Sequence, residues 1–181
     1  MTLILRLHMS PHLLRLTTAG LVFSTLLFVA GCTSVSLKST KDPAAVRKID
    51  RLFVLINQGE TDNQKWSNEL IEHFRKSLTN APVRLEFSIV SPLELDERVH
   101  DAKIKQFNAD AVLVVRVTTF VVSEYGGYPT IMYDVSLFDP EVKKRLWRGS
   151  VNNSGGTALM SRRMREMAEA IVSQLRKDGF L

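Results

Sequence analysis

Two short apolar runs constrain this chain more than any other feature of its 181 residues. Residues 52–56 read Leu-Phe-Val-Leu-Ile, and residues 111–115 read Ala-Val-Leu-Val-Val. Apolar runs of this length, without polar residues in alternation, are typical of strands buried on both faces. Such strands occur in parallel sheets covered by helices, so we expect an α/β domain built around these two segments.

The periodicity of apolar residues predicts the remaining elements. Amphipathic helices are indicated where apolar residues recur at steps of three and four, and half-buried strands where they alternate. In chain order, we expect a strand at 51–57, a helix at 62–80, a strand at 83–89, a helix within 92–108, strands at 111–122, 131–137 and 145–151, and a helix at 160–178. The methionines of the last helix, Met160, Met164 and Met167, form a stripe that we assign to the core.

The order β-α-β-α-β-β-β-α predicts two crossover units followed by a meander. Right-handed crossovers place the strand at 51–57 between those at 83–89 and 111–122, and the last two strands add antiparallel. The expected fold is a single α/β (α+β) domain. Its mixed five-stranded sheet has the order 2-1-3-4-5, counted along the chain, and packs against the first and last helices.

The amino-terminal segment has the pattern of an export signal. Residues 1–31 contain Arg6 and Arg15, no acidic residue, and an apolar stretch at 21–29. Its end, Val29-Ala30-Gly31-Cys32, resembles the lipobox of bacterial lipoproteins. The resemblance implies cleavage before Cys32. A membrane span is the alternative, but the apolar stretch is shorter than the roughly 20 residues that a span needs.

The lone cysteine supports this interpretation. Cys32 is the only cysteine in the chain, so no disulfide can form within it. The lipobox resemblance implies that Cys32 carries a diacylglycerol and an N-acyl group, with no other cofactor. Because Thr33 and Ser34 follow it without an aspartate, the resemblance further implies an outer-membrane anchor facing the periplasm.

The expected organisation has three parts. Residues 1–31 form a removed signal peptide, 32–49 the lipidated cysteine and a polar tether, and 50–181 the periplasmic domain. A flexible tether of about 16 residues reaches on the order of 20 to 25 Å. Loss of Arg6 and Arg15 with the signal lowers the net charge from +5 to +3, which is too small to identify a partner. Export makes nucleic acid an unavailable partner.

Three segments together resemble a periplasmic α/β superfamily. They are Arg51–Leu55, Ala109–Val115 and Tyr133–Asp139, the last followed by Leu146-Trp147-Arg148. The pattern is similar to the N-terminal domain of TolB, the curli-secretion lipoprotein CsgG and the penicillin-binding-protein activator LpoB. The resemblance implies a fold and an envelope role. The tether is shorter than that of LpoB and no pore-forming insertion like that of CsgG is present, so neither activity carries over.

Candidate contact residues lie in two places. Tyr125 and Tyr128 flank Gly126-Gly127 in the predicted hairpin loop, and exposed loop aromatics often anchor interfaces. Arg162 and Arg163 form a basic cluster with Arg165, a second cluster being Lys143–Arg145 with Arg148. Anionic lipid headgroups or acidic polymers are available partners for these charges.

Catalytic and metal-binding patterns are weak. Asp96 and His100 could share one helix face, but a solvated helix surface explains them better. Asp134 with Asp139 could form a carboxylate pair, but Asp139 before Pro140 is more simply a turn residue and Asp134 a residue on a solvated sheet face. No spacing typical of metal ligands is present. We therefore expect a non-enzymatic membrane-anchored accessory module of an envelope complex. The alternatives are a small-ligand or lipid carrier, with a groove between the last helix and the sheet, and an envelope hydrolase.

Overall fold

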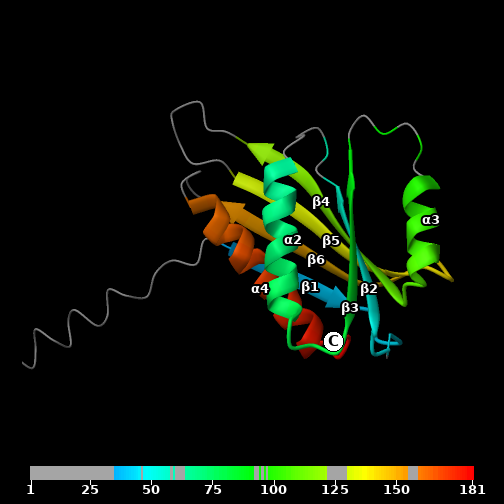
Figure 1. Ribbon diagram of the computed structural model, residues 1–181. Helices are drawn as coiled ribbons and strands as arrows, with labels where there is room; N and C mark the ends of the chain where they lie inside the picture. Colours follow the sequence, from blue (N-terminus) through cyan, green and yellow to red (C-terminus); the bar gives the residue numbers. More distant parts are fainter. Residues whose placement is uncertain are drawn as a thin grey trace, which may run out of the picture. The chain divides into compact units, whose positions relative to one another are not determined.

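The computed structural model describes residues 35–45, 47–57, 59, 64–91, 94, 96, 98–121, 130–154 and 159–181 (Figure 1). In chain order, its elements are β1 (Val35–Lys41), β2 (Arg51–Asn57), α2 (Gln64–Leu78), β3 (Arg84–Val90), α3 (Arg98–Phe107), β4 (Ala111–Val121), β5 (Thr130–Asp139), β6 (Lys144–Ser154) and α4 (Met160–Lys177). No helix in these ranges is both long and apolar enough to span a bilayer.

A six-stranded mixed sheet forms the centre of the domain, with the order β1-β6-β5-β4-β2-β3. Strand β2 pairs parallel with β3 and β4, and β4, β5 and β6 follow as an antiparallel meander. For the five strands predicted from the sequence, this is the expected order. The α+β class is confirmed, and the count of five strands is wrong by one.

The additional strand is β1, which lies in the segment predicted as a flexible tether. It pairs antiparallel with β6 along its whole length, from Val35 opposite Asn153 to Lys41 opposite Trp147. Val35 and Leu37 pack against the core, while Ser36 and Lys38 are exposed. This alternation is the pattern of a half-buried edge strand. The tether prediction is therefore wrong for residues 35–41.

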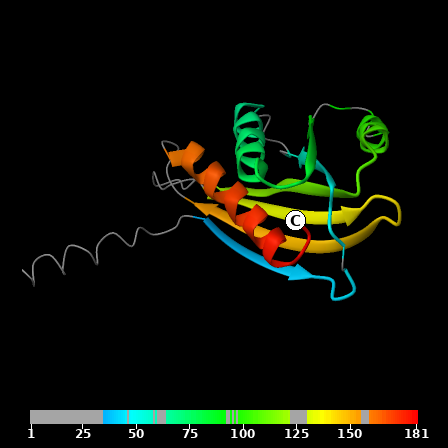
Figure 2. The same cartoon turned by 60° about the horizontal axis from the view of Figure 1, so that its bottom comes forward.

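Helices α2 and α4 cover one face of the sheet (Figure 2). Their apolar stripes meet the inward residues of the strands, and the predicted methionine stripe is buried in this core. Helix α3 packs on the opposite face, where the Phe107 ring meets Phe53 edge-on with centroids 6.2 Å apart. Because β2 is thus covered on both sides, its apolar run has no polar alternation.

Trp147 fastens β1, β6 and α4 together at one end of the core. The indole Nε1 donates to Asp178 Oδ2 at 2.7 Å, and Lys41 Nζ donates to the Asp178 carbonyl at 2.6 Å. The indole ring lies over Gly149, where a Cβ would stand 2.5 Å from the ring and 2.9 Å from a Leu37 methyl group. The missing side chain at Gly149 therefore leaves the space that the Trp147 ring and Leu37 occupy.

Asp110 links the amino-terminal ends of the parallel strands β2 and β4. Its Oδ2 accepts from the Arg51 backbone at 2.8 Å and from the Asp50 backbone at 3.2 Å, and its Oδ1 accepts from Arg51 Nη2 at 2.9 Å. Burial alone raises the pKa of Asp110, but the hydrogen bonds from Arg51 and Asp50 outweigh it and hold that pKa below its usual range. The ionised carboxylate is therefore the form that stabilises the fold.

Replacing Asp110 should change how stability depends on pH. A carboxylate with a depressed pKa contributes stability above the unfolded value of about 3.9, and that stability is lost as the pH falls through the lower folded value. We expect Asp110→Asn to lower the free energy of unfolding by about 1 to 3 kcal/mol at pH 7. Between neutral pH and pH ~3, the variant should lose less of its free energy of unfolding than the wild type loses.

Urea denaturation across that pH range measures both effects. Asp101→Asn, which alters an exposed carboxylate on α3, is the control. Parallel stability curves for the wild type and Asp110→Asn would contradict the role assigned to Asp110.

Candidate functional site

The predicted site residues divide between described and undescribed parts of the chain. Cys32, Tyr125 and Tyr128 lie outside the described residues. Arg162 and Arg163 lie in the first turns of α4. Arg162 is exposed, and its Nε donates to Glu166 Oε1 at 2.7 Å, one helical turn later. It stays a proposed contact.

Arg163 is buried, with 0% of its surface exposed. Its Nη2 donates to Met160 Sδ at 3.8 Å, and burial lowers the pKa of its guanidinium, although the charges of Tyr133 and Glu166 oppose this. The same burial raises the pKa of the Tyr133 hydroxyl. A side chain enclosed by its own domain does not reach a partner, so the predicted contact role of Arg163 is corrected.

His100 has different neighbours from those predicted. Its Nδ1 lies 3.0 Å from Ser88 Oγ on β3, and its Nε2 lies 2.5 Å from Glu94 Oε2. Lys103 Nζ also donates to Ser88 Oγ, at 3.3 Å. Asp96 instead precedes α3 and accepts from the Arg98 backbone and side chain, whose hydrogen bonds lower the pKa of that carboxyl. The predicted Asp96–His100 pair does not form.

A serine, a histidine and a carboxylate in one row are the groups of a hydrolytic triad. Here, however, both Ser88 and His100 are buried where α3 covers the sheet. A nucleophilic serine must meet a substrate carbonyl, and this hydroxyl is enclosed between β3 and α3. The arrangement therefore fastens α3 to the edge of the sheet. Ser88 and His100 are 12 residues apart in the chain. Apart from the polar face of β3, nothing in the sequence indicated that they would pair.

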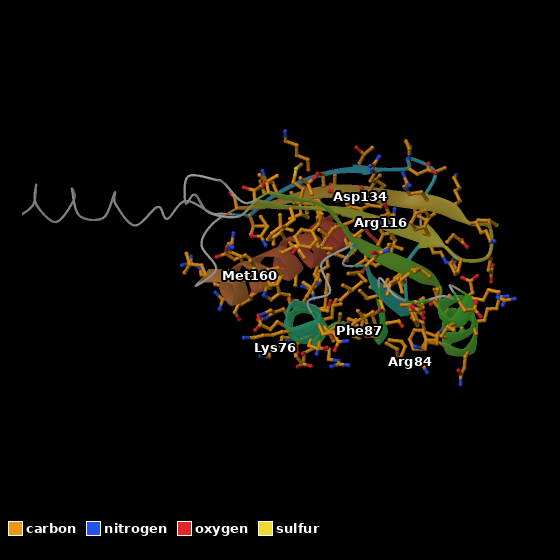
Figure 3. All side chains as sticks on the ribbon, turned by 90° about the horizontal axis from the view of Figure 1, so that it is seen from above. Lys76, Arg84, Phe87, Arg116, Asp134 and Met160 are labelled. Atoms are coloured by element: carbon orange, nitrogen blue, oxygen red, sulfur yellow. The ribbon has the colours of Figure 1, made fainter. Side chains whose placement is uncertain are left out.

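Asp134, Asp139 and Lys144 each form a separate ion pair. Asp134 binds Arg148 at 2.8 Å and Asp139 binds Arg47 at 2.8 Å, so the two carboxylates do not form a pair with each other. Figure 3 shows Asp134 beside Arg116, on the sheet face away from α2 and α4. Lys144, from the second basic cluster, binds Asp42 at 2.7 Å. Among the described residues, no group of His, Asp or Glu could hold a metal ion.

The space between the helices and the sheet is nearly filled. A cavity of about 20 Å³ lies there, lined by residues that include Trp66 of α2, Val115 of β4 and Met164 of α4. This volume holds about one water molecule. The predicted carrier groove between the last helix and the sheet is therefore wrong for the described structure, because an acyl chain or metabolite does not fit in it.

The exposed apolar side chains gather at one end of the domain. Six large ones are exposed among the described residues, and four lie where β4 ends, β5 begins and α4 begins. We call this the Val121 end, and its residues are Phe120, Val121, Met132 and Leu159. The Phe120 ring packs beside the Trp66 ring, with their centroids 6.5 Å apart. The sequence signal was present in Phe120, Val121 and Val122, the apolar residues that follow Arg116, Thr118 and Thr119.

Comparison with known proteins finds similar solved structures but no related sequence. No protein-family model matches the chain, and no curated protein matches its sequence. The PelC dodecamer of Paraburkholderia phytofirmans matches in structure with a TM-score of 0.53 and 16% identity, over 78% of this chain and 96% of PelC. Lipoprotein GNA1162 of Neisseria meningitidis gives a TM-score of 0.41 and 18% identity, over 70% of this chain and 96% of its own.

The similarity to PelC shows a shared fold. Its sequence identity is too low to transfer any property beyond the fold, and the similarity to GNA1162 is too distant to carry an argument. The narrower resemblance to TolB, CsgG and LpoB stays a prediction.

His100→Ala should weaken the packing of α3 on the sheet and leave the packing of the other elements unchanged. The substitution leaves Ser88 and Glu94 without their shared partner, and we expect a loss of about 1 to 3 kcal/mol in the free energy of unfolding. Hydrogen exchange should rise selectively in α3. His73→Ala, on α2, is the matched control. An unchanged unfolding midpoint and unchanged exchange in α3 would show that the His100 contacts do not support the fold.

Proposed function

We propose that this chain is a lipoprotein of the bacterial envelope, anchored in the outer membrane through lipid on Cys32 and facing the periplasm. The observation that carries the proposal is the sequence Val29-Ala30-Gly31-Cys32 at the end of an apolar stretch, with no other cysteine in the chain. A diacylglycerol and an N-acyl group supply three acyl chains, and two are enough for stable anchoring.

The domain, on this proposal, is a non-enzymatic accessory module of an envelope complex. Its core has room for about one water, and its Ser88 and His100 side chains are buried. A filled core and a closed hydroxyl favour a role in binding over one in catalysis or transport. PelC, which has the same fold, assembles as a dodecamer, and this supports a function within an assembly.

The proposed contacts are Tyr125 and Tyr128 for a protein partner, and Arg162 for an acidic group of the envelope. Residues 122–129 connect Val121 to Thr130, so both tyrosines lie in the connection between β4 and β5. The side chain of Arg162 is 61% exposed despite its ion pair with Glu166, so its guanidinium can bind a second anion.

Crosslinking in intact cells, followed by capture of the chain, tests the interaction role. The wild type should capture envelope proteins, and Tyr125→Ala/Tyr128→Ala should capture several-fold less of the same proteins because the aromatic contact area is gone. Val142→Ala, in the turn between β5 and β6, is the control and should behave as the wild type does. Failure of the wild type to capture any envelope protein would contradict the proposal.

A further inference from the structure

The Val121 end differs in chemistry from the rest of the described surface. Val121 is 52% exposed and Leu159 is 51% exposed. Met132, two residues after the start of β5, is exposed on the sheet face away from α4. The neighbouring strand positions carry uncharged side chains, Thr130 opposite Val121 and Asn152 opposite Met132. Figure 2 shows the start of α4 and the ends of the strands at the same end of the domain. An apolar cluster bordered by uncharged polar groups is a typical binding surface.

The chain also enters the domain at this end. Val35, the first residue of β1, lies opposite Asn153 of β6, and Asn153 lies opposite Ile131 of β5. The register therefore places Val35 one residue from the row that contains Val121 and Thr130. The point of entry and the exposed apolar cluster share one edge of the sheet.

The covalent link from the anchor to this edge is very short. Three peptide units separate Cys32 from Val35, and a fully extended chain of that length spans at most about 11 Å. The headgroup layer of one leaflet is roughly 5 to 8 Å thick. Because β1 is part of the sheet and not a tether, lipid on Cys32 would hold this edge at the headgroup layer.

Among the residues that the structure describes, the opposite end of the domain has no comparable arrangement. Val142, in the turn between β5 and β6, is 68% exposed, but its neighbours in the chain are Glu141 and Lys143. It lies about 30 Å along β5 from Thr130, at 3.4 Å for each residue of the strand. Val142 is therefore an exposed valine in a charged setting, far from the anchor.

We propose that the Val121 end is a membrane-contact surface, on which Val121, Met132 and Leu159 enter the boundary between headgroups and acyl chains. Arg162 lies one turn into α4 and would then meet a lipid phosphate. This inference rests on the proposed lipidation of Cys32 and adds an orientation to it: the domain lies directly on the bilayer with its strands running away from the surface.

Site-specific fluorescence tests the orientation in the full, lipidated chain. Lipidation consumes the sole cysteine, so Val121→Cys and Val142→Cys each supply a single free thiol for a nitrobenzoxadiazole label. The labelled proteins are reconstituted in vesicles of phosphatidylethanolamine and phosphatidylglycerol. We expect lipid-attached doxyl groups to quench the Val121 label several-fold more than the Val142 label, and aqueous iodide to do the reverse. A label at Leu159→Cys should follow the Val121 result.

The outcomes separate this inference from the anchoring on which it rests. Protein that does not float with the vesicles would contradict the lipid anchor itself. Protein that floats, but whose Val121 label is quenched by iodide and not by doxyl lipid, would overturn the orientation alone. A Val121 label shielded from both quenchers would also overturn it, because a second copy or another protein would then cover this end.

Discussion

The antiparallel pairing of β1 with β6 determines where the amino-terminal part of the chain enters the domain. The pairing is maintained by side chains as well as by the ladder: Leu37 and the Trp147 ring both lie over Gly149, and Lys41 donates a hydrogen bond to the Asp178 carbonyl after α4. The absence of a side chain at Gly149 leaves the space that Leu37 and the ring occupy. Without β1, residues after Cys32 would be a tether of about 20 Å or more, and the domain would have no fixed orientation toward its anchor.

Much of the fold could be predicted because burial leaves a strong pattern in sequence. Apolar runs without alternation identified the central strands β2 and β4, and the methionine spacing identified the core face of α4. Strand β1 was missed because an edge strand needs few apolar residues. Val35 and Leu37 are the only apolar residues of β1, and the surrounding serines, threonine and lysines have the composition of a linker.

The candidate sites were harder to predict, since they depend on contacts between distant parts of the chain. The row of Ser88, His100 and Glu94 exists only because α3 folds back over β3. The burial of Arg163 had a signal that could have been used. Position 163 is three residues after Met160 and four before Met167, which places it on the buried stripe of α4. The two adjacent arginines therefore have different surroundings, and Arg162 alone faces outward.

Everything said of orientation depends on the chemistry of Cys32, and the mass of the amino-terminal fragment of membrane-extracted protein tests it most directly. For the wild type, we predict a fragment that begins at Cys32 and carries a diacylglycerol and an N-acyl group. Cys32→Ala should retain residues 1–31, because diacylglycerol attachment must precede cleavage. A wild-type protein that retains residues 1–31, or a Cys32→Ala protein processed to the same size as the wild type, would contradict the lipid anchor.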